Sequence, residues 1–270
     1  MEVRRGTRDD FETVAQLTGN PDWVRSRWDV PSFEPERHLW LADGAFGALY
    51  APDEAVVRGD AALVPLLLAC IERQARTEAM PQLAFAIPES DEPTWRAYEE
   101  SGFALATVVL EMEVRLDTPP RELPAPDGVT FRSYTDGDAH AVRTLIDGAY
   151  EAWDETYVPL AHDDWLAFMT MHDSFDPDCW FLAACADGQL AGVCLTWKEG
   201  WIKDLAVTQA ARGRGLGESL LRNAFARLHD RGVRRVGLKV DAGNPTGAVR
   251  LYERVGMRTV KRHRFYVKTL

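Results

Sequence analysis

The sequence predicts an α/β protein built from two similar domains, each with a mixed, mostly antiparallel sheet flanked by helices. Similar segments occur in the same order in both halves, and a proline-rich stretch separates the halves. The 270 residues suffice for two domains of ordinary size. The stretch "DTPPRELPAPD" at 117–127 contains four prolines, which interrupt helices and central strands. We therefore expect one domain at 1–117, a linker at 118–127 and a second domain at 128–270.

The repeated segments indicate an internal duplication. Residues 3–17 and 131–145 have the same residue type at five positions with a constant offset of 128. These pairs are Arg4/Arg132, Thr7/Thr135, Asp10/Asp138, Val14/Val142 and Leu17/Leu145. Each copy predicts a short strand, a polar turn that caps a helix, and an amphipathic helix. A second match relates 94–103 to 248–257 at offset 154, and pairs Tyr98 with Tyr252.

The elements of the second half follow from their apolar runs and turns. Three β-rich runs between 179 and 207 are separated by "ADGQ" at 186–189 and "KEG" at 198–200, both typical of hairpin turns. A glycine-rich loop, a helix at 218–229 and a strand at 233–240 come next. A short helix at 244–256 and a last strand or hairpin arm at 259–270 complete this half.

The first half follows the same plan in a weaker form. Its predicted strands lie at 38–43, 45–51, 55–58, 82–87 and 105–116, and its predicted helices at 61–79 and 93–101.

Composition excludes several classes of function. The chain has 42 acidic against 31 basic residues, a net charge of −11, which disfavours nucleic-acid binding and suits a cationic partner such as an amine. The four cysteines form no CxxC pair, so we expect them to be reduced and predict no metal site. They are Cys70, Cys179, Cys185 and Cys194. No apolar run approaches the roughly 20 residues of a membrane span, and the first residues do not read as a secretory signal. We expect a cytoplasmic protein, either a monomer or a homodimer, that binds no membrane.

The segment "TQAARGRGLGESLL" at 208–221 is the strongest candidate for a binding site. It follows a predicted strand and opens a helix, and such a glycine-rich helix start presents free amides to a phosphate. Two known phosphate loops fail on spacing. A dinucleotide motif that begins at Gly213 needs a glycine where Glu218 stands, and a P-loop needs a Gly-Lys pair. The spacing that fits is Arg-x-x-Gly-x-Gly, at Arg212, Gly215 and Gly217.

At this point the chain resembles the GNAT acetyltransferase superfamily. Residues 205–221 are similar to its acyl-CoA pyrophosphate motif, and "NPTGAVRLYERVGM" at 244–257 is similar to the motif that follows it. One helix and one strand lie between the two, as in the family. The resemblance covers 128–270 well and 1–117 only in outline. The tandem layout, with the active copy in the second half, is similar in architecture to that of mycothiol synthases.

The resemblance implies acetyl-CoA as the co-substrate and assigns residues to it. Backbone groups of Leu205, Ala206 and Val207 would bind the pantetheine arm like an added strand. Amides of the loop would hold the pyrophosphate, from Arg212, Gly213, Arg214, Gly215, Leu216 and Gly217. Asn244 would bond the splayed strand or the cofactor. Tyr252 would lie near the thioester sulfur and protonate the leaving thiolate.

The identity of the general base stays open in the sequence. Lys203 stands where relatives often carry a glutamate, so Asp204 is the nearest candidate. Asp154, Glu155 and Glu199 are the other candidates. The aromatic-rich segment 149–169 lies where the family builds its acceptor pocket. Its Tyr150, Trp153, Tyr157 and Trp165 either line that pocket or pack in the core.

We therefore expect an N-acetyltransferase that moves an acetyl group to the primary amine of a small molecule. Two alternatives are an acyl-CoA-binding regulatory module without turnover and a protein N-terminal acetyltransferase. The first half lacks the Arg-x-x-Gly-x-Gly pattern: its corresponding strand is followed by a single glycine, Gly59, and Ser90 stands at the position of Asn244. We expect this half to hold no second CoA.

Overall fold

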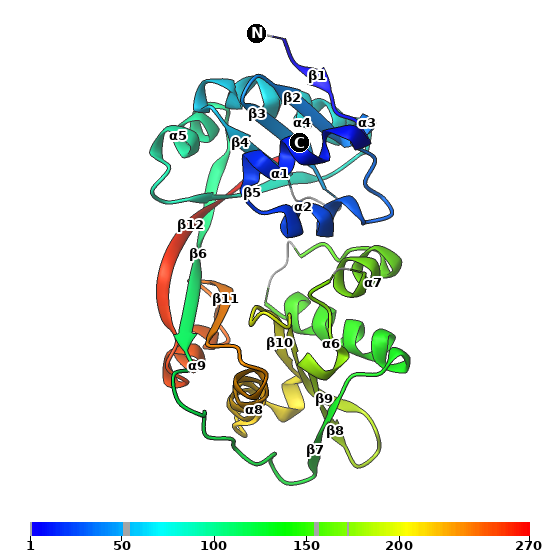
Figure 1. Ribbon diagram of the computed structural model, residues 1–270, viewed down its shortest axis with the longest axis vertical. Coiled ribbons are helices and arrows are strands. Elements are labelled where there is room, and N and C mark those ends of the chain that lie inside the picture. Colours follow the sequence, from blue (N-terminus) through cyan, green and yellow to red (C-terminus); the bar gives the residue numbers. More distant parts are fainter. Residues whose placement is uncertain (1, 51–54, 154–156, 172) are drawn as a thin grey trace. The chain divides into compact units, whose positions relative to one another are not determined.

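The computed structural model describes residues 2–50, 55–153, 157–171 and 173–270, and the chain divides into two compact units (Figure 1). Unit 1 comprises Met1–Val109, Val158–His172 and Arg262–Leu270, and unit 2 comprises Leu110–Tyr157 and Asp173–Lys261. The units thus interleave along the chain, and the proline-rich segment 118–127 lies within unit 2. The domain boundary that we placed in this segment stays a prediction.

Unit 1 contains an antiparallel sheet in the order β1-β2-β3-β4 and helices on both of its faces. The strands are β1 (Arg4–Arg5), β2 (Leu39–Ala42), β3 (Ala45–Leu49) and β4 (Ala55–Gly59). The helices are α1 (Phe11–Thr18), α2 (Pro21–Trp28), α3 (Pro35–His38), α4 (Val64–Thr77), α5 (Glu92–Glu100) and α7 (His162–Thr170). The strands and helices predicted for the first half are confirmed, whereas α2, α3 and α7 were not predicted.

Two apolar clusters stabilise unit 1. One cluster joins α4 to β5 (Gln82–Pro88) and α5 through fully buried side chains such as Leu67, Ile71 and Phe85. The other joins α1 and α2 to the sheet through Val14, Trp28 and Phe46. The end of the chain also belongs to this unit. Strand β12 (Arg258–Thr269) pairs antiparallel with β5 from His263↔Pro88 to Thr269↔Gln82.

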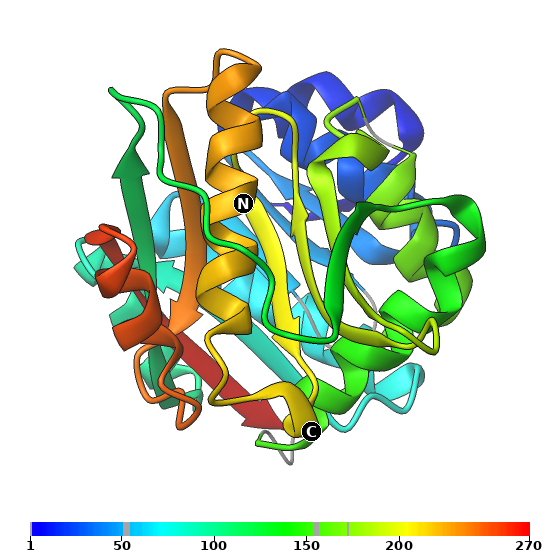
Figure 2. The same cartoon turned by 90° about the horizontal axis from the view of Figure 1, so that it is seen from below.

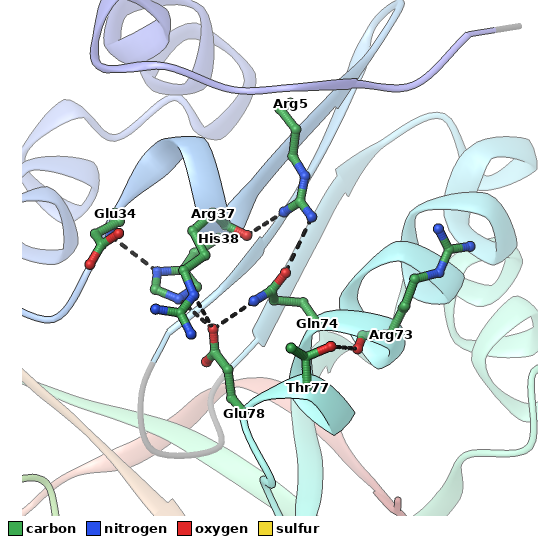
Figure 3. A network of polar contacts seen from close by, with 8 residues as sticks. All are labelled: Arg5, Glu34, Arg37, His38, Arg73, Gln74, Thr77 and Glu78. Carbon is green, nitrogen blue, oxygen red and sulfur yellow. Dashed lines mark hydrogen bonds and ion pairs between the residues drawn. The ribbon is translucent and has the colours of Figure 1, made fainter.

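A polar network fastens the first strand of unit 1 to the end of α4 (Figure 3). Glu78 accepts hydrogen bonds from Gln74 Nε2 at 2.8 Å and His38 Nε2 at 2.9 Å, and pairs with Arg37 Nε at 2.9 Å. Arg5 donates to Gln74 Oε1 at 3.2 Å and to the Arg37 carbonyl. Burial pushes the pKa of Glu78 upward, but the hydrogen bonds from Gln74 and His38 outweigh it, and the pKa is lowered. The carboxylate of Glu78 is therefore the charged centre of this network.

Unit 2 contains the antiparallel sheet β10-β9-β8-β7. Its strands are β7 (Val129–Ser133), β8 (Trp180–Cys185), β9 (Leu190–Thr196) and β10 (Ile202–Val207). Helices α6 (Ala139–Glu151) and α8 (Leu216–Asp230) pack on this sheet. Strand β11 (Arg235–Asp241) pairs with β6 (Ala104–Arg115) in a further sheet, and α9 (Ala248–Arg254) lies between β11 and β12. The predicted mixed, mostly antiparallel α/β fold is confirmed.

The proline-rich segment is bound along α8 (Figure 2). Ser219 Oγ and Asn223 Nδ2 donate to the Leu123 carbonyl at 2.9 and 2.7 Å. The Arg214 guanidinium donates to the Asp127 carbonyl at 2.7 Å. Proline removes the N–H groups that a strand or helix would use, but the carbonyls of this segment still accept hydrogen bonds.

The repeated segments have the same local structure in both units. Arg4 pairs with Asp10 at 2.5 Å and Arg132 with Asp138 at 2.6 Å. Thr7 and Thr135 each form a capping box with the aspartate of their own copy. In both copies the hydrogen bond from the arginine lowers the pKa of the aspartate to about 2. Among the described residues, no helix is both long and apolar enough to cross a bilayer.

The lowered pKa of Asp138 predicts a pH-dependent contribution to stability. Because its pKa lies below the unfolded value, the carboxylate stabilises the fold above that value and stops doing so as the pH falls toward about 2. We expect Asp138→Asn to lower the free energy of unfolding by about 1 kcal/mol at pH 7. The difference from the wild type should shrink at pH 3. Denaturant titrations at both pH values measure this, and Asp136→Asn, an exposed carboxylate in the same turn, is the control. An equal loss in both variants would contradict the assignment.

Candidate functional site

Strands β10 and β11 of unit 2 touch at one point and then diverge. Trp201 and Gly237 form an isolated parallel bridge, and the Gly237 N–H donates to the Gly200 carbonyl at 2.9 Å. A Cβ on residue 237 would lie 2.9 Å from the Trp201 ring, so glycine lets the two strands approach here. Beyond the bridge, β10 and β11 belong to separate sheets. Among the described residues, the edge of β10 at Leu205–Val207 that faces away from β9 has no ladder partner.

Strand β10 carries a bulge at the start of this open edge. Ile202 pairs with Thr196 and Asp204 with Leu195, so Lys203 is one extra residue opposite β9. From Asp204 onward the register is regular, with Leu205↔Cys194 and then on to Val207↔Gly192. A bulge re-aims the side chains that follow it, and here the residue directly after it is Asp204.

The glycine loop between β10 and α8 has the geometry of an anion site. Gly213 and Gly215 adopt φ of 74° and 79°, and Gly215 is the N-cap of α8. These left-handed conformations favour glycine. Glycine is favoured at position 217 by close packing and not by its φ, because a Cβ there would lie 3.2 Å from Leu251 Cδ2. In the first turn of α8 the amides precede the regular helical bonds, which begin with Ser219 N–H to the Gly215 carbonyl at 3.0 Å. These amides and the helix dipole attract a negative charge.

The two arginines of the loop are engaged by main-chain carbonyls. Arg212 Nε donates to the Val207 carbonyl at 3.3 Å, while Arg214 reaches the proline-rich segment as described above. Both side chains therefore help to hold the loop between β10 and α8. This leaves the main-chain amides as the groups best placed for a phosphate.

In the second motif Asn244 precedes α9 and Tyr252 lies within this helix. Asn244 Oδ1 accepts from the Thr246 N–H at 3.0 Å and from its hydroxyl at 2.5 Å, which shapes the turn before α9. Tyr252 lies on α9 and is buried. Burial, with added contributions from Cys194 and Asp204, raises the pKa of Tyr252, so its phenol keeps its proton at neutral pH. The cofactor role of Asn244 stays a prediction.

Asp204 meets α6 through Tyr150. The Tyr150 hydroxyl donates to Asp204 Oδ1 at 3.2 Å. Asp204 is surrounded by protein atoms, yet part of its surface remains accessible. Burial raises the pKa of Asp204, and the charge of Lys203 and the hydrogen bond from Tyr150 oppose this shift. A carboxylate with a raised pKa is a better proton acceptor, because its pKa lies closer to neutral pH.

Three of the four aromatic residues predicted for an acceptor pocket are brought together. Tyr150 and Tyr157 stack with ring centroids 5.1 Å apart and planes 17° apart, and Trp153 lies 6.1 Å from Tyr150. Trp165 is buried on α7 and belongs to unit 1. Of the other candidate bases, Glu199 is exposed in the turn before β10, while Asp154 and Glu155 lie outside the described residues.

Sequence reasoning missed the partners of these aromatic residues. Tyr157 donates to Asp147 Oδ1 at 2.7 Å, and Arg143 Nε pairs with Asp147 at 2.9 Å. One helix carries Arg143, Asp147 and Tyr150, which are four and then three residues apart. This spacing places them on one face of the helix, so their proximity could have been predicted from the sequence.

The corresponding corner of unit 1 is built differently. The Asp60 carboxylate caps the turn after β4 by accepting the Ala62 N–H at 3.0 Å. Pro65 lies in the first turn of α4 and has no N–H to offer. Helix α4 thus begins directly after this capped turn, with no glycine loop between them, and the absence of a second CoA from the first half stays a prediction. Within the described residues, no group of three or more His, Cys, Asp or Glu side chains could hold a metal ion.

A splayed sheet beside a glycine loop and a long helix defines unit 2 as a GNAT-type α/β domain. Residues 139–257 match the model of the Acetyltransferase (GNAT) family, so this segment is similar to that family. The resemblance predicted from the two motifs is confirmed.

Several known proteins are similar to this chain in sequence or in structure. A mycothiol acetyltransferase of Salinispora tropica is 37% identical over 161 residues, which are 56% of this chain and 52% of that protein. A GCN5-related N-acetyltransferase from Sphaerobacter thermophilus has 26% identity and a TM-score of 0.77 over 99% of this chain and 95% of its own. A tandem GNAT protein from the clavulanic acid biosynthesis pathway shares the fold, with 17% identity and a TM-score of 0.66 over 99% and 98%. The matched part of this chain spans about half the length of several curated relatives.

Proposed function

We propose that the protein transfers an acetyl group from acetyl-CoA to the primary amine of a small molecule, and that unit 2 performs the reaction. The observation that carries this proposal is the open edge of β10. Asp204 lies at one end of it, and the amides at the start of α8 lie just beyond the other. An extended acyl-pantetheine arm fits along such an edge as an added strand.

Each residue of the site has a part in this proposal. Main-chain groups of Leu205–Val207 bind the arm, the amides from Arg212 to Gly217 bind the pyrophosphate, and Asn244 holds the turn beside α9. Asp204 accepts the proton that the ammonium must lose before its nitrogen can attack the thioester carbonyl. Tyr252 donates its proton to the sulfur as the C–S bond breaks. After attack the nitrogen loses its second proton as the tetrahedral adduct collapses to the amide, and this proton restores the phenol of Tyr252. The products are an amide and free CoA thiol, with the first proton of the ammonium left on Asp204.

The similar proteins and the chemistry of the site both support an acetyl donor and an amine acceptor. The relatives reported above are named mycothiol acetyltransferases or N-acetyltransferases. The site itself presents the carboxylate of Asp204 beside the aromatic rings of Tyr150 and Tyr157, and both kinds of group attract an ammonium ion. A net charge of −11 attracts a cationic substrate at longer range.

A screen of primary amines with acetyl-CoA tests this proposal, with release of free thiol as the readout. We expect release with at least one compact amine and an N-acetylated product of matching mass. No release with any amine, together with tight CoA binding in calorimetry, would instead favour an acyl-CoA-binding module without turnover.

The role of Tyr252 leads to a specific prediction. We expect Tyr252→Phe to lower kcat by roughly 10²-fold and to leave the affinity for acetyl-CoA within about twofold, because only the departing thiolate needs its proton. Tyr98→Phe is the matched control, since Tyr98 is the repeat counterpart of Tyr252 and is also buried, in unit 1. Steady-state kinetics and calorimetry measure both. An unchanged kcat in Tyr252→Phe removes Tyr252 as the acid.

A further inference from the structure

We infer that Tyr150 is a positioning residue for Asp204: its hydroxyl holds one carboxylate oxygen and leaves the other for the proton of the amine. This inference rests on the proposed function, since it assigns a partner to the proposed base. Tyr150 is 54 positions from Asp204 in the sequence, and the two meet where α6 packs on β10.

The hydrogen bond from Tyr150 fixes one oxygen of the Asp204 carboxylate. The phenol donates to Asp204 Oδ1 at 3.2 Å, so this oxygen faces α6. A proton from an amine must therefore go to the remaining acceptor positions of the carboxylate. A phenol whose pKa is raised well above its usual value, chiefly by the charge of Asp204, remains a donor at every pH used for the reaction.

The Tyr150 ring is held in place by its neighbours. Tyr157 stacks on it with planes 17° apart, and the Tyr157 hydroxyl is fixed on Asp147 at 2.7 Å. Asp147 is in turn paired with Arg143 Nε at 2.9 Å, and the side chain of Arg143 is only 8% exposed. Arg143, Asp147 and Tyr157 thus form a brace that keeps the Tyr150 ring from swinging away. A merely space-filling tyrosine would not need this series of polar contacts.

Charged groups on two elements act on Asp204. Lys203 on its own strand and Arg143 on α6 favour its ionised form, while Asp147 on α6 opposes it. Cys194 of β9 and Tyr252 of α9 also face it and are neutral at neutral pH, because their own pKa values are raised by burial. Tyr150 adds to this set a direct hydrogen bond, which favours the carboxylate and gives it a direction.

The test compares Tyr150→Phe with Tyr157→Phe, two variants that each remove one phenol hydroxyl and keep the stacked rings. In Tyr150→Phe the pKa of Asp204 should rise, and the acidic limb of kcat/KM should move to higher pH. We expect a loss of roughly tenfold in kcat/KM at pH 6, a smaller loss at pH 8, and an unchanged affinity for acetyl-CoA. Tyr157→Phe keeps the direct bond to Asp204 and loses only part of the brace, so we expect it to shift the limb and the pKa less than Tyr150→Phe does.

The pKa of Asp204 can be read without any substrate, from the ¹³C-carboxylate resonance of labelled protein. A Tyr150→Phe protein that folds normally and keeps the wild-type titration of this resonance overturns the inference. So does an equal shift in Tyr157→Phe, because the effect would then not come from the direct bond. Failure of the proposed function would look different: Asp204→Asn would keep full activity, whatever the outcome for Tyr150.

Discussion

Replacing Gly215 by glutamate is expected to weaken the binding of acetyl-CoA by at least roughly 100-fold. Gly215 caps α8 with φ of 79°, a conformation that costs a residue with a side chain about 1 kcal/mol or more. The new carboxylate would also stand at the helix N-terminus, where the proposed pyrophosphate needs the amides and the dipole for itself. Isothermal titration with acetyl-CoA and with CoA measures the loss.

The turn between β8 and β9 offers a matched control. Gly188 has φ of 83°, and a Cβ there, as at Gly215, would meet no atom within 4 Å. Gly188→Glu therefore adds the same charge and a similar backbone strain at a place outside the loop. We expect it to lose stability as Gly215→Glu does but to bind acetyl-CoA like the wild type. Equal binding by the two variants would remove the loop as the phosphate site.

The features that the sequence predicts well are local. The glycine loop depends on the conformation of Gly213 and Gly215 and on the helix that starts at Leu216, all within a few residues. The polar turn that caps the first helix of each copy was also predicted, and its capping box spans three residues. Such patterns specify their own geometry whatever surrounds them. A few neighbouring residue types are therefore enough to predict the glycine loop and the capped turns.

The features that the sequence did not predict depend on distant partners. The bulge at Lys203 exists only relative to β9, and the bond between Tyr150 and Asp204 joins positions 54 apart. The pairing of β12 with β5 brings the last residues of the chain into unit 1, although 259–270 was expected to complete the second half. Strand pairing of this kind follows no local signal, because any apolar alternating strand can extend several sheets.

The basic residues of β12 illustrate the same limit. In the sequence, Lys261, Arg262, Arg264 and Lys268 look like a solvated face or a contact for a phosphate. In the structure each pairs with a carboxylate of its own unit: Glu111, Glu89, Glu99 and Glu72, respectively. Their charges are therefore largely compensated within the fold, and they give no added support to a phosphate site.

Asp204→Asn is the second change for which we expect a large effect. The amide keeps the shape of the side chain and an oxygen for the Tyr150 hydroxyl, but it has lost most of its basicity. We expect kcat/KM for the amine to fall by roughly 10²–10⁴-fold at pH 7, with acetyl-CoA binding unchanged. Glu199→Gln removes the other described candidate base and should retain full activity.

The pH dependence of this loss distinguishes a base from a residue that only orients the amine. An alkylammonium loses its proton to water near pH 10 without help, so the base is needed less as the pH rises. The ratio of wild-type to Asp204→Asn activity should therefore fall steadily from pH 7 to pH 10. A ratio that stays constant over this range would show that Asp204 positions the amine without accepting its proton. Steady-state rates at a fixed, saturating concentration of acetyl-CoA provide this measurement, and Tyr252→Phe serves as a reference, because its deficit should not shrink in the same way.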